Sequence, residues 1–375
     1  MRVLFISHEA TRSGAPIALL QEISYICNYC KDIKPEVLFL RGGELLKEFS
    51  DICVIYRAWV NNPRLNKLLC RLGIINLMIK YLFFRKKYDC IYANTVVSFE
   101  IADKINKRYA IPLIGHVHEA ECLMQYFQIK KLMLVNFDCF LTVSKLAASN
   151  LIENYNVPEH KVRIQHPISF WVDKYMRGEI TINAYNYKEK GPLIGCFCNG
   201  DWFKSTEIIP LFFKSFIDKF PDSRCKLVII GGQDYLTHYY LEFVLKKMSL
   251  SERVIWLGKV DNPLDYLVNI DVFLLLSREE SFSLAAQEAA IMETPIIGFK
   301  GATGAEEWIE KGAGLLVPYM DLNEMSKSLY SIISNNEFKQ NMGRKAKAIV
   351  EDLYREDSQM KVVKETITNV CLGNR

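Results

Sequence analysis

Short runs of apolar and β-branched residues alternate along the chain with longer segments in which apolar positions recur at helical spacing. This alternation is typical of βαβ units built around parallel sheets. The runs that predict strands lie at 2–7, 36–40, 90–93, 112–118 and 139–144 in the first half, and at 193–198, 226–232, 254–258, 272–277 and 294–299 in the second half. Each set is enough for its own doubly wound sheet, so the pattern predicts an α/β protein with two domains.

A polar segment without clear periodicity separates the two sets of strands. It is rich in Tyr, Asn, Lys and Gly, which favours an interdomain linker at 169–190. We therefore predict an N-terminal domain at 1–168 and a C-terminal domain at 191–355. The last helical pattern, 356–375, is expected to cross back and complete the first domain.

Length and charge agree with this organisation and exclude some functions. A chain of 375 residues exceeds the usual size of one hydrophobic core. The net charge of +4 is small, and no lysine- or arginine-rich tract is interleaved with aromatic residues, so we expect no nucleic-acid partner. The eleven cysteines are scattered and the first residues run directly into a strand, which favours a cytoplasmic protein with free thiols.

The longest apolar region, 65–87, carries lysines and arginines but no acidic residue. Lys67, Arg71 and Lys80 interrupt it, so no uncharged run approaches the ~20 residues that cross a bilayer. Two interpretations stay open: a helix that lies in an anionic membrane surface, or the solvated face of an ordinary helix.

A carboxylate pair stands out in the stretch SREESFSLAAQEAA, 277–290. A strand ends near Ser277 and a helix is expected to start about Ser283, and ligands of open parallel sheets bind where strands lead into helices. Ser283 is a good N-cap, which leaves backbone N–H groups for an anion. Glu288 falls among alanines, where a buried carboxylate needs a partner. Ligand hydroxyls would serve, and so would a buried arginine or backbone N–H in a purely stabilising role.

Other strand ends carry candidate polar groups. Gly14 permits close backbone approach in the loop after the first strand, and Pro16 suits a first helical turn. His116 and His118 share one face of their strand, where either fits a core histidine or a ligand contact. Ser144 is best interpreted as a helix N-cap.

The sequence around Glu280 and Glu288 resembles a known motif. Residues 271–299 are similar to the nucleotide-sugar motif of the retaining glycosyltransferases of family 4, in which two glutamates with seven residues between them precede a small-residue helix and a Pro-headed strand. Residues 301–318, with Glu307, resemble the segment that follows this motif in the family. The resemblance is strongest over 190–330 and implies the GT-B fold, two Rossmann-like doubly wound domains facing a central cleft.

By this resemblance, Glu280 contacts the hydroxyls of the donor sugar and Glu288 contacts the ribose. Backbone N–H groups are expected to meet the diphosphate at Phe282, Ser283 and Leu284. Gly258 and Val260, in a stretch similar to the strand and turn that hold the base, join the donor-binding set.

The loop at 198–209 resembles the one in which the family places a basic pair on the diphosphate, and Lys204 matches the lysine. We assign Asn199, in the same loop, to donor binding as well. Phe203 stands where an arginine is common, and Ser205 and Ser283 stand where the family has glycines. Arg278 is a candidate for the missing positive charge.

The first domain has its own implied residues. By resemblance, Gly14 and Ala15 lie near the donor phosphate and the acceptor. His118 matches a histidine expected to touch the donor sugar or orient the acceptor, so the catalytic set is Glu280, Lys204 and His118. With no Asp-x-Asp pair and no spaced His/Cys set, no metal and no cofactor are expected.

Together these features predict a retaining hexosyltransferase that uses a UDP- or GDP-sugar and a saccharide acceptor, lipid-linked, in bacterial surface polysaccharide or lipopolysaccharide biosynthesis. It would be cytoplasmic and, under the first interpretation of 65–87, peripheral on the inner face of the membrane. The alternatives are a catalytically weak GT-B scaffold, which the Phe203 and Ser205 departures motivate, and a nucleotide-sugar epimerase.

Overall fold

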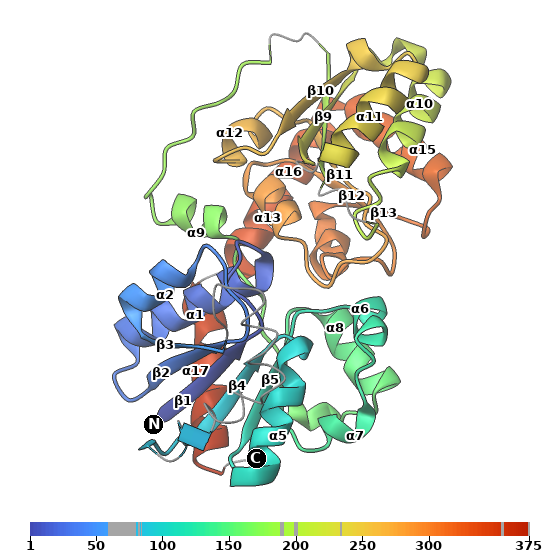
Figure 1. Cartoon of the computed structure of the whole chain (residues 1–375). Coiled ribbons are helices and arrows are strands. Elements are labelled where there is room, and N and C mark those ends of the chain that lie inside the picture. The colour runs from blue at the N-terminus through green and yellow to red at the C-terminus, as the bar shows by residue number, and fades with distance from the viewer. Residues whose placement is uncertain are drawn as a thin grey trace. The chain divides into compact units, whose positions relative to one another are not determined.

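The computed structural model describes residues 1–58, 80–81, 83, 85–187, 191–198, 202–232, 235–353 and 356–373. The chain divides into two units (Figure 1). The first comprises Met1–Pro167 and Glu356–Arg375, and the second comprises Ile168–Arg355. Each unit has its own parallel sheet and its own hydrophobic core, so each is described separately.

The first unit is built on a seven-stranded sheet in the order β3-β2-β1-β4-β5-β6-β7, and all its neighbouring strands are parallel. The strands are β1 (Arg2–Ser7), β2 (Lys34–Phe39), β3 (Val54–Arg57), β4 (Cys90–Asn94), β5 (Leu113–Val117), β6 (Cys139–Thr142) and β7 (Val162–Ile164). The order reverses between β1 and β4, and a ligand site is expected beyond their carboxyl ends.

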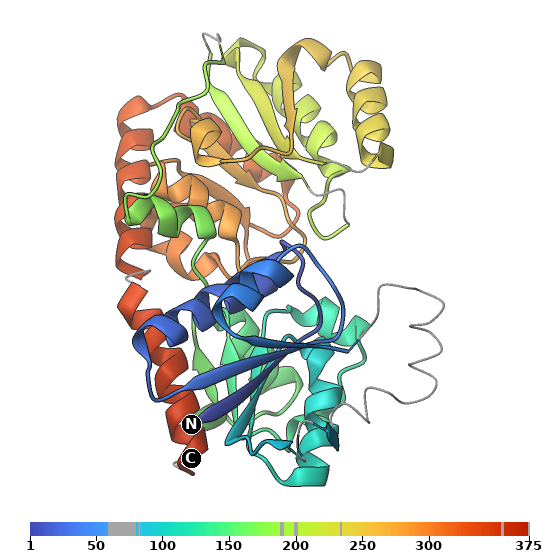
Figure 2. The same ribbon diagram turned by 60° about the vertical axis from the view of Figure 1, so that its left-hand side comes forward.

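Helices cover both faces of this sheet. They are α1 (Gly14–Tyr29), α2 (Leu46–Ile52), α5 (Phe99–Tyr109), α6 (Glu121–Tyr126), α7 (Lys131–Leu134), α8 (Lys145–Ser149) and α17 (Glu356–Cys371). Leu19 of α1, Phe49 of α2 and Ile367 of α17 pack on one face, and Phe99 of α5 lies in the core of the other. Figure 2 shows α17, in red, beside the sheet of this unit. The last helix therefore completes the first unit.

The second unit has a six-stranded parallel sheet in the order β10-β9-β8-β11-β12-β13. The strands are β8 (Leu193–Cys198), β9 (Lys226–Gly231), β10 (Val254–Gly258), β11 (Val272–Leu275), β12 (Ile296–Phe299) and β13 (Gly314–Val317). The helices are α9 (Phe170–Met176), α10 (Ile208–Lys219), α11 (Tyr235–Lys247), α12 (Leu264–Leu267), α13 (Leu284–Ile291), α14 (Glu306–Trp308), α15 (Leu322–Ile333) and α16 (Asn336–Leu353). Here the order reverses between β8 and β11.

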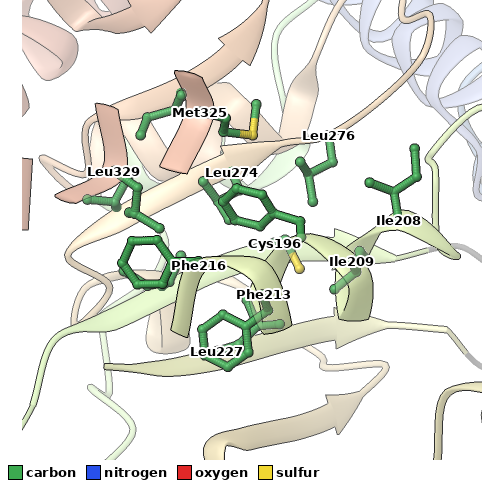
Figure 3. Packing of buried hydrophobic residues seen from close by; sticks show 14 of the residues in the cluster. Cys196, Ile208, Ile209, Phe213, Phe216, Leu227, Leu274, Leu276, Met325 and Leu329 are labelled. Atoms are coloured by element: carbon green, nitrogen blue, oxygen red, sulfur yellow. The ribbon is translucent and has the colours of Figure 1, made fainter. Parts of the chain in front are cut away.

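One core of the second unit lies between its sheet and helices α10 and α15 (Figure 3). Phe213 and Phe216 of α10 and Leu329 of α15 are fully buried against Leu227 and Leu274 of the strands. Full burial of such side chains contributes about 1.5–3 kcal/mol each, so this face holds the β8 and β11 ends in place.

The strands expected from the sequence are confirmed, but β3, β7 and β13 were missed. All three are edge strands of three or four residues. An edge strand is covered on fewer sides, so its sequence need not be a continuous apolar run.

The segment expected as a linker also differs from the prediction. Ser169 caps helix α9, whose Val172 is fully buried, and the residues that follow dock on the second unit. The Tyr185 ring stacks on Tyr266 at 4.9 Å, and the Tyr185 N–H donates to the Asp265 carbonyl at 2.7 Å. Much of 169–187 is therefore structure of the second unit, held by contacts that are distant in sequence.

Most of the basic apolar stretch 65–87 lies outside the described residues. Among the helices that the structure describes, none is both long and apolar enough to cross a membrane.

Candidate functional site

The loops after β8 and β11 meet at the reversal point of the second sheet. Lys204, from the loop after β8, forms an ion pair with Glu280, from the loop after β11. The Ser277 hydroxyl donates to the other carboxylate oxygen of Glu280 at 2.9 Å. The two predicted catalytic residues of this unit are thus brought together, because β8 and β11 are adjacent parallel strands.

The backbone of Glu280 is fixed from a third loop. Its N–H donates to the Ala302 carbonyl at 2.7 Å, and its carbonyl accepts from the Gly304 N–H at 2.9 Å. Glu280 and Thr303 form an isolated parallel bridge. These hydrogen bonds hold the backbone of Glu280, and with it the base of its side chain, in place.

Arg278 ties the two loops together from the other side. Its guanidinium donates to the Trp202 carbonyl at 2.8 Å, lies 4.5 Å from the Trp202 ring centroid, and forms an ion pair with Glu207. Its backbone N–H donates to the Phe203 carbonyl at 2.8 Å. The positive charge of Arg278 is thus already compensated by Glu207, and the side chain acts on the loop that carries Lys204.

Helix α13 begins beside this pair. Ser283 is fully buried, and its hydroxyl accepts from the Ala286 N–H at 3.2 Å, so the predicted N-cap is confirmed. Phe282 is also buried, and Leu284 opens the helix. Because the first turn of a helix leaves N–H groups without intrahelical partners, this end favours an anion.

Glu288 lies in the next turn of α13 and is buried. Its carboxyl oxygen accepts a hydrogen bond of 2.5 Å from the hydroxyl of Ser169, at the start of α9. Burial raises the pKa of Glu288 to about 7, although the hydrogen bond from Ser169 opposes the shift. Gln287 holds the same segment, since its side-chain oxygen accepts from the Ser169 N–H at 3.1 Å. The sequence did not identify Ser169, which lies in the segment taken for a linker.

The remaining donor-binding candidates of this unit lie at strand ends. Gly258 closes β10 with a φ of +66°, and a side chain there would meet no neighbouring atom, so its backbone conformation is what favours glycine. Val260 lies two residues on. Asn199 lies outside the described residues.

In the first unit, Asn94, which was not predicted, contacts both His118 and Ala15, which were. The side chain of Asn94, at the end of β4, lies 2.9 Å from His118 Nε2 through its Oδ1 and donates to the Ala15 carbonyl at 3.3 Å. His118 is thereby connected to the loop of Gly14 and Ala15. Burial lowers the pKa of His118 to about 3, so the imidazole is neutral at physiological pH. Asn94 directly follows a predicted strand, and the strand-end rule would have found it.

His116 belongs to a separate buried cluster beneath this edge. Its Nδ1 lies 2.7 Å from the Tyr92 hydroxyl, which in turn lies 3.0 Å from a carboxyl oxygen of Glu22. Burial raises the pKa of Glu22 to about 8 and lowers that of His116 well below its usual range. The cluster is therefore neutral at neutral pH. Of the two roles predicted for His116, a core histidine or a ligand contact, the structure shows the hydrogen-bonded core histidine.

Glu119 is a further buried carboxyl that the sequence did not single out. It accepts hydrogen bonds from the backbone N–H of Val96 at 3.2 Å and of His118 at 3.0 Å. Burial raises its pKa to about 7, against the effect of these hydrogen bonds. A carboxyl that changes charge near neutral pH, directly after His118, can act as a base.

Two other sequence interpretations can be compared with the structure. The Ser144 hydroxyl accepts from the Ala147 N–H at 3.2 Å, so Ser144 caps α8. Lys86, counted among the basic residues of 65–87, donates to the buried Glu36 carboxylate at 2.9 Å.

In the described part of the chain, no group of three or more His, Cys, Asp or Glu side chains could hold a metal ion.

Part of the second unit is similar to a known protein family. Residues 211–349 match the family model described as glycosyl transferases group 1. The chain is 32% identical over 134 residues to N-acetyl-alpha-D-glucosaminyl L-malate synthase of Bacillus anthracis. That match covers 35% of this chain and 34% of the enzyme, so the chain spans about a third of the length of this curated relative.

Solved structures match over the whole chain. HepE of Anabaena in complex with UDP has a TM-score of 0.75 at 16% identity, covering 98% of this chain and 100% of that one. The lipopolysaccharide outer core galactosyltransferase WaaB, in its apo form, has a TM-score of 0.74 at 17% identity and covers 100% of both chains. The likeness confirms the expected fold. Residues 211–349 therefore resemble the glycosyl transferases group 1 family, in a chain that has the GT-B fold.

Proposed function

We propose that this chain is a retaining hexosyltransferase that moves a sugar from UDP or GDP to a saccharide acceptor. The observation that carries the proposal is the pairing of Lys204 with Glu280 at the reversal point of the second sheet, beside the start of α13. A cation and a helix N-terminus at this edge suit the diphosphate of a nucleotide sugar, and the nearby carboxylates suit the hydroxyls of its ribose and its sugar ring.

Each group has a proposed role. Glu280 accepts hydrogen bonds from the donor-sugar hydroxyls, and Glu288 accepts them from the ribose. The diphosphate lies against Lys204, Asn199 and the N–H groups at 282–284, and the base lies against Gly258 and Val260. Arrival of the donor replaces the ion pair between Lys204 and Glu280 with contacts to substrate. Lys204 then faces the charged diphosphate, and Glu280 accepts hydrogen bonds from sugar hydroxyls, so neither group is buried without a partner.

The reaction breaks the bond from the anomeric carbon to the phosphate oxygen and forms a bond from that carbon to the acceptor oxygen. The leaving phosphate takes the acceptor's proton on the same face of the sugar, which retains configuration and needs no protein nucleophile. Lys204 and the α13 N-terminus stabilise the charge that grows on the leaving oxygen. They supply the positive charge that a metal would otherwise bring, and we propose that neither a metal nor a cofactor is required.

The first unit is proposed to supply the acceptor side. His118, which lies 2.9 Å from Asn94, is proposed to orient the acceptor or the donor sugar. The loop of Gly14 and Ala15, which Asn94 also contacts, is proposed to bind near the donor phosphate and the acceptor. Neutral His118 can donate or accept a hydrogen bond without bringing a charge.

The acceptor is proposed to be lipid-linked, as in bacterial surface polysaccharide or lipopolysaccharide assembly. WaaB, with a similar fold, is named for lipopolysaccharide core synthesis, and the basic apolar segment 65–87 fits an anionic inner membrane face. Arg85 and Lys87 of this segment are exposed.

A panel of UDP- and GDP-sugars tests the proposal. A donor should raise the melting temperature, because it binds the folded chain. With an acceptor it should yield free nucleotide and a new glycoside of unchanged anomeric configuration, with and without EDTA. Tight binding without turnover for any acceptor would indicate a scaffold, and an isomerised sugar nucleotide would indicate an epimerase.

A further inference from the structure

The connection between β5 and β6 exposes an unusual group of large apolar side chains. Tyr126 is 75% exposed, Phe127 41%, Leu132 82% and Val135 68%. These residues, together with Lys130 and Lys131, are called the α6–α7 surface below. Clusters of exposed apolar side chains are uncommon on monomers and mark interaction sites.

The local structure explains why these side chains point outward. Helix α6 buries Met124 and helix α7 buries Leu134, and both helices are short. A turn joins them, with Gln128 at a φ of +52°. Each short helix has one anchoring side chain, so its other apolar residues remain on the surface.

The charge of this surface is positive. Lys130 and Lys131 are exposed, and neither forms an ion pair with a residue that the structure describes. On the neighbouring α5, by contrast, Lys104 pairs with Glu100 and Lys107 pairs with Asp103, each at 2.6 Å. The uncompensated cations therefore lie beside the apolar side chains.

A groove of ≈ 610 Å³ runs between α5 and the α6–α7 surface. Its apolar lining comes from Val96, Val97, Phe127, Ile129, Leu132 and Met133. Lys104, Lys107 and Lys130 line it as well, with Glu100 and Asp103. Because Lys104 and Lys107 pair with Glu100 and Asp103, Lys130 is the uncompensated cation of the groove among the described residues. An apolar groove with such a cation at its edge suits acyl chains whose head groups carry negative charge.

We propose that the α6–α7 surface docks on an anionic phospholipid bilayer. Exposed Leu132, Val135 and Tyr126 enter the interfacial layer, and Lys130 and Lys131 contact lipid phosphates. Tyrosine suits this layer because its ring is apolar and its hydroxyl is polar. This surface is distinct from the segment 65–87.

The surface is connected to the candidate site of the same unit. Val96, which lines the groove, donates its N–H to Glu119, and α6 begins two residues after Glu119. A membrane-borne acceptor held at this groove would be presented to Glu119 and His118. This second step rests on the proposed function, whereas docking itself does not.

Vesicle flotation with the full chain, without donor or acceptor, tests the docking. The chain should bind phosphatidylcholine vesicles that contain phosphatidylglycerol and bind vesicles of phosphatidylcholine alone much more weakly. Lys130→Gln with Lys131→Gln should lower the partition coefficient roughly 30-fold, since each lysine near an anionic surface contributes about 1 kcal/mol. Leu132→Glu with Val135→Glu should abolish binding.

The matched control is Tyr29→Glu. Tyr29 is 63% exposed at the end of α1, which packs on the opposite face of the sheet, so binding should not change. Melting temperatures of all variants should stay near that of the parent, because the changed side chains are exposed.

Three results would overturn the proposal. They are no binding to phosphatidylglycerol vesicles, undiminished binding of the Leu132 and Val135 double variant, and loss of binding only when Arg85 and Lys87 are changed to glutamine. The last would assign the contact to 65–87. Since flotation needs no turnover, a failed transferase assay leaves the docking result intact.

Discussion

The hydroxyl of Ser169 donates a 2.5 Å hydrogen bond to the buried carboxyl of Glu288, across 119 residues of sequence. Ser169 also accepts from the Trp171 N–H at 3.3 Å, so one residue both caps α9 and holds the carboxyl. A carboxyl with one such partner and a pKa of about 7 is destabilising once it ionises. That cost is expected where a ligand later supplies further hydrogen bonds.

Replacing Glu288 with glutamine should therefore stabilise the free chain at alkaline pH. The folded pKa is raised, so the parent is favoured at low pH and loses stability as pH rises from about 4.5 to about 7. Glu288→Gln removes this loss, and above pH 7 its free energy of unfolding should exceed that of the parent by about 3 kcal/mol. Denaturant unfolding of both proteins across this pH range measures the difference.

The same substitution should weaken nucleotide binding, about tenfold, because a hydrogen bond to a charged group is lost. Glu310→Gln is the control, since Glu310 is exposed. A variant that lost stability at pH 8, or that bound the donor nucleotide, UDP or GDP, as tightly as the parent, would contradict the assigned role.

Lys204→Ala should lower kcat by about 100- to 1000-fold, the usual cost of removing one group that stabilises a developing oxyanion. Glu280 would keep its hydrogen bond from Ser277, so the loop after β11 should hold its shape. Steady-state release of nucleotide in the presence of acceptor measures the effect.

Lys214 provides the matched control for Lys204. It lies on the exposed side of α10 and pairs with Asp218 at the surface. Lys214→Ala should leave kcat unchanged, and equal losses in both variants would argue against a specific role for Lys204.

Arg278 is a positioning residue, because its guanidinium contacts protein groups of the loop that carries Lys204. Arg278→Gln should lower kcat about tenfold while KM for the donor changes little, since Lys204 remains but its placement is lost. Trp202 fluorescence should change with it, because the guanidinium lies 4.5 Å from the ring.

Arg278→Lys distinguishes positioning from simple charge. A lysine can keep the ion pair with Glu207 but cannot fill the same set of donors, so kcat should recover only in part. Full recovery would show that charge alone is needed.

The sequence predicted the central strands because a strand buried on both faces must be apolar throughout. It missed β3, β7 and β13 because short edge strands carry less of that pattern. For the candidate site, too, some residues were predicted from the sequence and others were missed. Glu280 was found because it follows a central strand, whereas Lys204 was found through the resemblance of its loop to a known family.

The hydrogen-bond and ion-pair partners of the site residues were not predicted from the sequence, because these pairs form only through tertiary contacts. Ser169 lies in a segment without periodicity, and its contact with Glu288 exists only after the two segments have folded together. The engagement of Arg278 with Glu207 was likewise invisible, since a loop arginine has no fixed partner in the sequence. Asn94 and Glu119 sit at strand ends, so the strand-end rule that pointed to Glu280 could have found them as well.

Lys86 lies in the basic segment 65–87, but it also stabilises the fold, so membrane attachment through this segment must be tested without changing Lys86. Its ammonium binds the Glu36 carboxylate, which is 1% exposed and also accepts from the hydroxyls of Tyr56 and Tyr88 at 2.8 and 2.7 Å. Burial favours the protonated acid, but the hydrogen bonds prevail and lower the pKa of Glu36. The stability from this pair is thus present above the unfolded pKa and lost as pH falls through the folded one.

Lys86→Gln should destabilise the fold by about 3 kcal/mol, since it leaves the buried Glu36 carboxylate with only the more distant Arg2, whose Nε lies 3.5 Å away. Arg85→Gln with Lys87→Gln should cost almost nothing, because both side chains are exposed. Thermal unfolding at pH 7 separates the two. Equal melting temperatures would show that the Glu36 pair adds nothing to stability, whereas the expected difference restricts any vesicle test of this segment to Arg85 and Lys87.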